Sequence, residues 1–348
     1  MPELTATRPK GEAPVAETRR LKYGEAVNAA LARVLAELPE TLLYGEDVGK
    51  PGGVFGVTRG LRRKFGDRVF DTPISEAAIL GSAVGAALMG ARPIVEIMWA
   101  DFSLVALDQL VNQAANARYV SRGAAPAPIV VRTQQGNAPG ACAQHSQSLE
   151  ALFLHVPGLR LAMPRTAQDA HDALVSAVHA DDPVIVVENR SLYFGDKAEV
   201  ELGGAARPMG WSHLRRPGRD VTVVSWGTVT SQALAAAESL AAGGIEAEVL
   251  ELTWLNPLDL DAVLASVART RRLAVVHEAN VTGGFGGEIV ARVAEAGIAL
   301  DAAPLRVGAP DVRIPAAPVL AEPLLPDAGS IAARISAHVS GQVSGSAR

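Results

Sequence analysis

The chain has 348 residues, which corresponds to two domains at roughly 150 residues each and excludes a single small module. Hydrophobic residues make up 49% of the sequence and charged residues 20%, a balance that excludes a disordered chain. With 32 basic and 37 acidic residues, the net charge of −5 gives no indication of a nucleic-acid partner.

The cysteine content and the apolar stretches bear on the cellular compartment. The only cysteine, Cys142, cannot form an internal disulfide, and we therefore expect the reducing cytoplasm. An uncharged Gly/Ala-rich stretch, residues 77–91, has 15 residues, whereas a membrane span needs about 20. We expect a buried helix there and no membrane contact. Residues 1–20 are polar and are expected to form a flexible tail.

From residue 21 onward, helical stretches alternate with short apolar runs, a pattern typical of a parallel sheet with helices on both faces. We expect helices over 23–38, 59–65, 77–91, 103–121 and 166–180. Between them we expect strands over 42–44, 69–71, 93–97, 129–131 and 184–188. These elements predict a first α/β domain over residues 21–193.

The periodicity fails over residues 194–219, where Gly-Gly, Arg-Pro and Pro-Gly pairs predict a linker. Strands are expected again over 220–226, 246–251 and 273–278, with helices over 229–242, 260–270 and 328–339. This pattern predicts a second, smaller domain over 220–339, followed by a flexible Gly/Ser-rich tail over 340–348. The predicted fold class is α/β, with two doubly wound domains.

Two glycine-containing motifs raise the question of nucleotide binding. Residues 45–50 are one residue too short for a phosphate loop, and Pro51 stands where Ser or Thr is required, so we exclude that loop. Residues 283–287, Gly-Gly-Phe-Gly-Gly, lie where a dinucleotide-binding turn would lie, but Ile289 occupies the place of the third glycine. A tight turn with close packing is the favoured interpretation, and a nicotinamide-dependent dehydrogenase stays open as an alternative.

Two residues are candidates for chemistry at the carboxyl edge of the first sheet, where doubly wound sheets bind ligands. Glu76 opens the helix after the strand over 69–71, with Ser75 as its expected N-cap and Ile74 beside it. His145 follows the strand over 129–131. Each also has a structural interpretation, as a solvated first-turn acid and as a loop histidine. The spacing of the histidines indicates no transition-metal site.

Taken in order, several segments resemble the beta subunit of the thiamin diphosphate-dependent decarboxylating component of 2-oxo acid dehydrogenase complexes, of the pyruvate, branched-chain 2-oxo acid and acetoin type, in the transketolase-like family. The segments are GEDV at 45–48, GGVF at 52–55, DTPISE at 71–76, RPIVE at 92–96, DQ at 108–109, QHSQ at 144–147, VPGL at 156–159, HE at 277–278 and TGGFGG at 282–287. The resemblance covers residues 21–339. It implies a transketolase-like pyrimidine-binding domain followed by a transketolase C-terminal-like domain.

The resemblance also implies a cofactor and partners. In this family, thiamin diphosphate lies between two subunits: the beta subunit holds the aminopyrimidine, and the alpha subunit holds the diphosphate and Mg²⁺. The Gly-Asp-Gly motif of alpha subunits is absent from this sequence. The resemblance therefore implies an alpha subunit in an alpha2-beta2 heterotetramer, a lipoyl acyltransferase core and a small 2-oxo acid substrate.

Three polar residues receive catalytic roles by the resemblance. Glu76 would hydrogen-bond the pyrimidine nitrogen and favour the imino tautomer that deprotonates the thiazolium, a role suited to a buried acid with a raised pKa. The resulting ylid attacks the keto carbon, and carbon dioxide leaves as the thiazolium accepts the electrons. His145 would face the reacting carbonyl and assist acyl transfer, and Glu46 would lie on a proton path between paired active sites.

The remaining site residues are implied in the same way. The cofactor would be bound by Glu46, Ile74, Ser75, Glu76, Met98 and Phe102. Phe102 would lie against the pyrimidine, and Trp99 would join His145 in the substrate pocket, where its bulk is unusual and reshapes the acyl site. Core packing is the structural interpretation of Met98 and Trp99.

Two positions depart from the family pattern. Some relatives bind a structural potassium ion, and the matching positions here are Ile129, Ala177, Val178 and Asp182. Ala180 replaces an acid expected nearby, which leaves main-chain carbonyls as the expected ligands. Thr253 replaces a basic residue, at a position tied to a subunit contact or to the active-site entrance.

The sequence therefore predicts the beta subunit of a 2-oxo acid dehydrogenase, active only with an alpha subunit, that oxidatively decarboxylates pyruvate or a branched-chain 2-oxo acid and transfers the acyl group to lipoamide. An acetoin-cleaving or specialised biosynthetic enzyme half is an alternative, because the same half-site serves each substrate. A non-catalytic assembly subunit is another alternative, against which the presence of Glu76, Phe102 and His145 argues.

Overall fold

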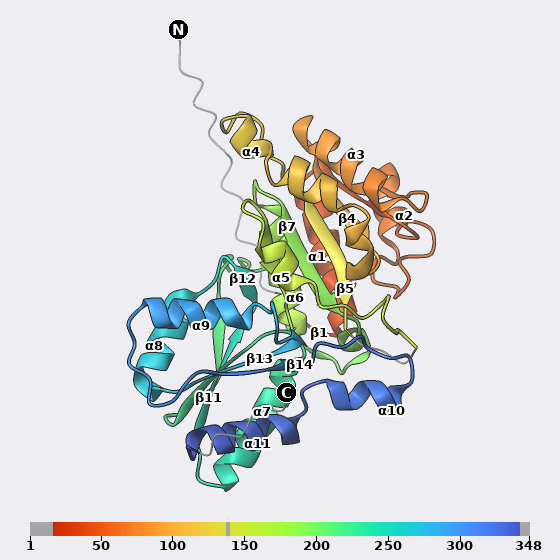
Figure 1. The fold of residues 1–348 in the computed structure, drawn as a ribbon. Helices are drawn as coiled ribbons and strands as arrows, with labels where there is room; N and C mark the ends of the chain where they lie inside the picture. The colour runs from red at the N-terminus through yellow and green to blue at the C-terminus, as the bar shows by residue number, and fades with distance from the viewer. Residues whose placement is uncertain (1–16, 137–139, 342–348) are drawn as a thin grey trace.

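The computed structural model describes residues 17–136 and 140–341. They form two α/β domains, of which the N-terminal one occupies the upper part of Figure 1 and the C-terminal one the lower part. The predicted fold class is confirmed. No helix within the described residues has the length and apolar character needed to cross a membrane.

The first domain is built on a seven-stranded sheet in the order β12-β6-β7-β5-β4-β2-β3. All strands run parallel except β12, which is antiparallel to β6. The chain passes from β2 first to β3 on one side and then to β4 on the other, so the switch point lies between β2 and β4. The strands are β2 (Thr41–Gly45), β3 (Val69–Asp71), β4 (Arg92–Ile97), β5 (Val130–Gln135), β6 (Arg160–Ala162), β7 (Val184–Asn189) and β12 (Trp254–Asn256).

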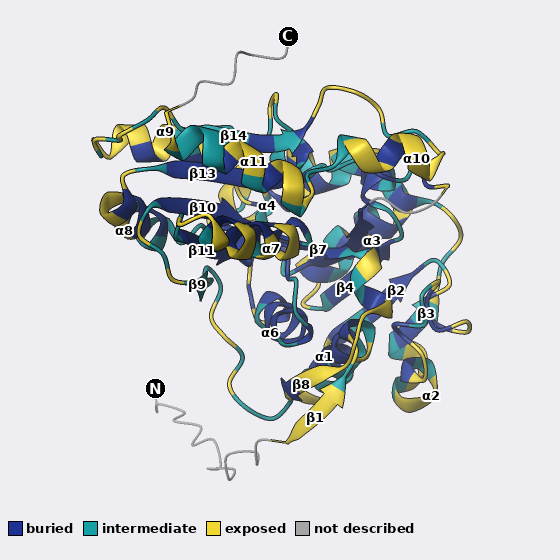
Figure 2. Ribbon diagram, turned by 90° about the horizontal axis from the view of Figure 1, so that it is seen from below, coloured by how far each residue is buried: buried dark blue, intermediate teal, exposed yellow. Residues whose placement is uncertain are grey.

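Helices cover both faces of this sheet, which explains the nearly continuous apolar strands. On one face, α1 (Tyr23–Glu37) and α6 (Ala167–Val178) pack side by side, as Figure 2 shows. On the other face lie α3 (Glu76–Leu88), the π-helix η3 (Gln109–Ala114) and α5 (Glu150–Leu154). Short helices complete the domain: α2 (Leu61–Phe65), η1 (Gly66–Arg68), η2 (Ala100–Leu104), α4 (Ala117–Val120) and η4 (Arg190–Phe194).

The second domain has a five-stranded sheet in the order β14-β13-β10-β11-β9, in which only the edge strand β9 is antiparallel. The strands are β9 (Ser212–Arg216), β10 (Val221–Ser225), β11 (Ala247–Leu252), β13 (Leu273–Asn280) and β14 (Leu305–Ala309). Helices α7 (Val229–Ala242) and α11 (Ala328–Val339) cover one face, and α8 (Leu260–Thr270) and α9 (Gly286–Glu295) the other. The short α10 (Pro318–Ala321) and η5 (Glu322–Leu324) precede α11. The α8 and α9 face shares one continuous apolar core with the first domain.

Some predicted elements differ from the structure. The helix expected over 103–121 is broken into η2, η3 and α4. Asn112 and Asn116 are poor helix formers, and their side chains bond to Asp108 Oδ1 and to the Asn112 carbonyl instead. The Gly/Ala-rich helix α3 is only half buried: Ile79 and Leu80 face the sheet, while its outer face is exposed in this chain.

Strands also form where a tail and a linker were expected. β1 (Thr18–Leu21) pairs antiparallel with β8 (Ala198–Glu201), and β9 completes the second sheet. Figure 2 shows the β1–β8 pair as mostly exposed. β1 lacks apolar alternation, and β8 shows it over only four residues, so neither strand has a clear sequence signal.

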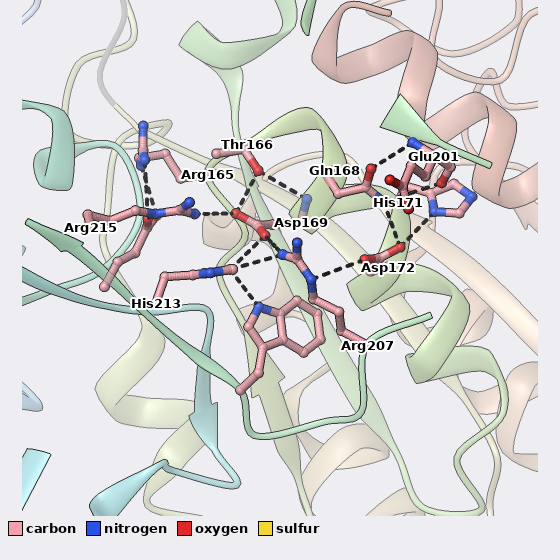
Figure 3. Close-up of polar contacts among 12 residues, drawn as sticks. Arg165, Thr166, Gln168, Asp169, His171, Asp172, Glu201, Arg207, His213 and Arg215 are labelled. Atoms are coloured by element: carbon pink, nitrogen blue, oxygen red, sulfur yellow. Dashed lines mark hydrogen bonds and ion pairs between the residues drawn. The ribbon is translucent and has the colours of Figure 1, made fainter. Parts of the chain in front are cut away.

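An ion-pair cluster joins α6 to the second sheet (Figure 3). The buried Asp169 carboxylate accepts hydrogen bonds from Arg207 Nη1 at 2.9 Å and Arg215 Nη2 at 2.8 Å, and His213 Nε2 lies 2.9 Å from it. Arg215 also pairs with Glu251 of β11. These hydrogen bonds and positive neighbours outweigh the effect of burial and hold the pKa of Asp169 at about 2. The segment expected to be an irregular linker is thus fixed by buried charges.

Candidate active site

The residues singled out in the sequence lie along one edge of the first sheet, in strand order. Glu46 directly follows β2, and Glu76 opens α3 just after β3. Met98 and Trp99 follow β4, and His145 lies in the loop after β5. Since β2, β3, β4 and β5 are parallel neighbours, these positions meet at the carboxyl edge around the switch point, where such sheets bind ligands.

Two carboxyl groups face each other at this edge. Glu76 is 9% exposed, and Glu46 is half-buried. Burial raises the pKa of Glu46, and the negative charges of Glu76 and Asp47 raise it further. Within residues 17–136 and 140–341, the Glu76 carboxylate has no hydrogen-bond donor at bonding distance. The structure therefore holds at the switch point a largely buried glutamate whose carboxylate keeps an accessible edge that a ligand nitrogen could reach.

An aromatic group lies next to the carboxyl pair along the edge. The His145 ring meets Trp99 edge-on at 5.5 Å between centroids and Phe102 at 5.3 Å. Phe55 meets the Trp99 ring at 5.6 Å from another side. The structure thus brings together three residues that the sequence assigned to cofactor and substrate.

The other expected cofactor residues have less defined contacts. Ser75 is the N-cap of α3, but its hydroxyl makes no capping bond in the described chain. Ile74 is 82% exposed, so it provides no apolar cover for Glu76 within this chain. Met98 is half-buried at the end of β4. Ile74 therefore leaves this side of Glu76 open in the single chain.

One buried residue at the same edge was missed in the sequence. Arg190 follows β7, is 6% exposed, and lies with its guanidinium carbon 4.0 Å from the centre of the Trp99 ring. The signal that could have indicated it is a cation directly after a strongly apolar strand at the ligand edge. The sequence around Arg190 does not indicate which residues its side chain contacts.

A cavity of about 420 Å³ lies between the domains on the far side of the His145 loop. It is lined by Gln147 of that loop and by Glu278 and Arg313 of the second domain. Burial raises the pKa of Glu278, which accepts a hydrogen bond from Thr228 Oγ1 at 2.7 Å. Arg313 donates to Gln147 Oε1 at 2.7 Å, and this contact ties the loop to the second domain.

The glycine run over 283–287 is used for packing. His277 is fully buried and stacks on Trp226 with the ring centroids 5.2 Å apart. A Cβ at Gly284 would come within 2.7 Å of the His277 ring, and one at Gly286 within 2.9 Å. Burial lowers the pKa of this histidine to about 4, so the ring is neutral at physiological pH. The glycines at 284 and 286 therefore leave space for the buried His277 ring. This agrees with the interpretation of residues 283–287 as a tight turn with close packing.

Replacing Gly286 with alanine is expected to lower the free energy of unfolding by about 1–3 kcal/mol, because the added methyl group would push against His277. Gly287→Ala is the matched control in the same helix, where the nearest atom lies 3.6 Å from the added carbon. The control should be neutral or slightly stabilising. Urea denaturation checks both, and equal midpoints would contradict the packing role.

The expected potassium ligands are occupied by the chain itself. Arg92 Nη1 donates to the carbonyl oxygens of Val178 and Ala180, each at 2.9 Å. The Asp182 carboxylate accepts hydrogen bonds from two arginines. The main-chain oxygens of the other two candidates, Ile129 and Ala177, accept N–H groups. This donor set does not fit a bare potassium ion, and we build no role on one.

Two family models match the chain in the order in which its domains occur. Transketolase, pyrimidine binding domain, matches residues 19–195, and Transketolase, C-terminal domain, matches residues 210–331. A solved structure described as "Split gene transketolase, inactive beta4 tetramer" superposes with a TM-score of 0.77 at 24% identity, covering 92% of this chain and 99% of that chain. The fold is therefore that of the transketolase-like class of proteins.

Curated relatives identify the family within this class. Acetoin:2,6-dichlorophenolindophenol oxidoreductase subunit beta from Cupriavidus necator is 43% identical over 326 residues, which are 90% of this chain and 96% of that protein. Pyruvate dehydrogenase E1 component subunit beta-2 from Oryza sativa is 39% identical, covering 95% and 89%. 2-Oxoisovalerate dehydrogenase subunit beta from Bacillus subtilis is 38% identical, covering 86% and 93%. The chain belongs to the family of E1 beta subunits, enzyme components of 2-oxo acid dehydrogenase complexes.

Proposed function

We propose that this chain is the beta half of a thiamin diphosphate-dependent 2-oxo acid dehydrogenase that decarboxylates a small 2-oxo acid and passes the acyl group to lipoamide. Membership in a transketolase-like family implies thiamin diphosphate as the cofactor. The observation that carries the proposal is the buried, unpartnered Glu76 carboxylate at the switch point. When bound, the cofactor supplies the electron sink for decarboxylation.

Each site residue of this chain would have its own role in binding or catalysis. Glu76 would hold a proton against the pyrimidine nitrogen, and its burial would keep water from competing for that bond. Phe102 would support the pyrimidine ring, with Ile74, Ser75 and Met98 around it. His145 would donate a hydrogen bond to the substrate carbonyl and to the transferred acyl group. Glu46, whose pKa is raised, would exchange protons with Glu76.

An alpha subunit is part of this proposal. The names of the relatives describe them as beta subunits, and Ile74 beside Glu76 is exposed in the single chain, which supports a partner that closes the site. Among the described residues, no group of three or more His, Cys, Asp or Glu side chains could hold a metal ion. We therefore assign the diphosphate and Mg²⁺ to the alpha subunit, in an alpha2-beta2 heterotetramer that serves a lipoyl acyltransferase core.

Acetoin cleavage is the second candidate function. The relative from Cupriavidus necator is named as an acetoin oxidoreductase subunit. Trp99 contacts Phe55, His145 and Arg190, and its bulk would narrow the expected acyl pocket and favour a compact substrate over a branched-chain acid. Both candidates use the same half-site, so the substrate must be measured.

The test is reduction of an artificial electron acceptor by the chain purified together with its candidate alpha subunit, with thiamin diphosphate and Mg²⁺, across pyruvate, branched-chain 2-oxo acids and acetoin. We expect turnover that requires both chains and the cofactor, and the best substrate identifies the class. Turnover by the beta chain alone, or a stable cofactor-bound complex that is inactive on the whole panel, would contradict the proposal.

A further inference from the structure

Arg190 joins the end of β5 to His145, which lies in the loop after that strand. It is the first residue of η4, and its Nη2 donates to the main-chain oxygens of Gly136 and of His145, the latter at 2.8 Å. Gly136 adopts φ +105°, and a Cβ there would lie 2.5 Å from Asn189 Nδ2, so only glycine lets this backbone approach β7 so closely. One guanidinium thus links Gly136, which directly follows β5, to His145.

The same guanidinium holds the aromatic wall of the candidate site. It stacks on Trp99 at 4.0 Å, and Trp99 meets the His145 ring edge-on at 5.5 Å. Arg190 therefore contacts His145 in two ways. It donates a hydrogen bond to the His145 carbonyl oxygen, and it packs on the Trp99 indole that contacts the His145 ring. Few other arrangements would fix both the position of the loop and the direction of the imidazole.

Arg190 is buried without an ion pair. Among residues 17–136 and 140–341, no carboxylate lies within 4.0 Å of its guanidinium. Burial lowers the pKa of Arg190, while the more distant Asp101 and Glu278 oppose this effect. An unpaired buried cation is destabilising unless hydrogen bonds satisfy it. Arg190 Nη2 donates to the main-chain oxygens of Gly136 and His145, while the buried Nε has no hydrogen-bond partner among the described residues.

We propose that Arg190 is a positioning residue that clamps the His145 loop and orients the imidazole through Trp99. The kinetic consequence rests on the role proposed for His145, but the clamp itself does not. The two parts of the proposal therefore need separate readouts, one structural and one kinetic.

Hydrogen–deuterium exchange of the full chain in complex with its alpha subunit tests the clamp. In Arg190→Met, exchange over residues 140–148 should be at least about tenfold faster, because the charge-assisted hydrogen bonds to the Gly136 and His145 carbonyls are lost. Exchange in α1 should stay unchanged. Arg33→Met is the matched control, because Arg33 Nη1 also donates to two carbonyls, those of Leu202 and Gly204, far from the site. Arg33→Met should speed exchange only around residues 202–204. Unchanged exchange over 140–148 would overturn the proposal.

Steady-state kinetics tests the consequence. Arg190→Met should lower kcat about 10–100-fold and leave KM within about threefold, and Arg190→Lys should restore part of kcat because it keeps the charge and the donors. A rise in KM for 2-oxo acids, with acetoin unaffected, would mean that Arg190 binds the substrate carboxylate and would overturn the positioning role. If the wild-type complex is inactive on every substrate, the proposed function fails, while the exchange experiment still decides the clamp.

Discussion

Replacing Glu76 with glutamine in the assembled complex should reduce thiamin diphosphate-dependent turnover by at least about 100-fold. Glutamine keeps the size and the hydrogen-bonding capacity of the side chain but cannot hold and release a proton. Because Glu76 is only 9% exposed at the switch point, little solvent reaches its side chain. The measurement is dye reduction at saturating cofactor, with the best substrate of the panel.

Glu46→Gln is the control for this experiment, since it makes the same change in the neighbouring carboxyl group. We expect a smaller loss, because Glu46 is half-buried and exchanges protons only through Glu76 in our proposal. The Glu76 variant should also lower the pKa of Glu46, whose rise comes in part from the charge of Glu76. Turnover within threefold of wild type would rule out a proton-carrying role for Glu76.

Replacing Asp169 with asparagine should destabilise the chain by about 3 kcal/mol, because Arg207, Arg215 and His213 lose the carboxylate that they share in a buried site. Arg215 keeps Glu251, which limits the loss. Glu288→Gln is the control: it removes an exposed pair with Arg292 and should change the stability by less than about 0.5 kcal/mol. Urea unfolding measures both, and similar small shifts would contradict a docking role for the cluster.

The pH dependence of Asp169 follows from the direction of its shift. Its pKa in the folded chain is about 2, below the ordinary value of 3.8, so the stabilising contribution is present above pH 4 and is lost as the pH falls from 4 to 2. The shift corresponds to roughly 2 kcal/mol. In Asp169→Asn, this component of the acid unfolding curve should vanish. If the acid unfolding curves of Asp169→Asn and the wild type are the same between pH 4 and 2, Asp169 makes no such contribution to stability.

The predicted helices over 229–242, 260–270 and 328–339 have the observed bounds, because amphipathic periodicity and capping side chains agree there. Asp259 and Asp327, for example, accept main-chain N–H groups at the N-caps of α8 and α11. β14 was missed because it is short, half-exposed and contains Gly308, which packs against His277. β6 and β12 were missed as well, although both are largely buried, because each has only three residues. Local pattern thus predicts longer elements that bury one face and fails for elements that are very short or bury little.

The candidate site divides in the same way. Glu76 and His145 could be singled out because each follows a strand at the ligand edge, and family resemblance then assigned their roles. Arg190 could not, since its partners Gly136, His145 and Trp99 are far away in the sequence and meet only in the folded sheet. Sequence pattern locates side chains at an edge, but contacts between loops depend on the tertiary structure.

The first sheet is incomplete without strand β12. Trp254–Asn256 belongs to the second half of the chain, yet it pairs with β6 at the border of the first sheet. Residues 21–193 alone would leave the N–H and C=O groups of β6 free to template pairing with another copy. The second half of the chain therefore protects the first from edge-to-edge association, and the two domains are separable in sequence but not in structure.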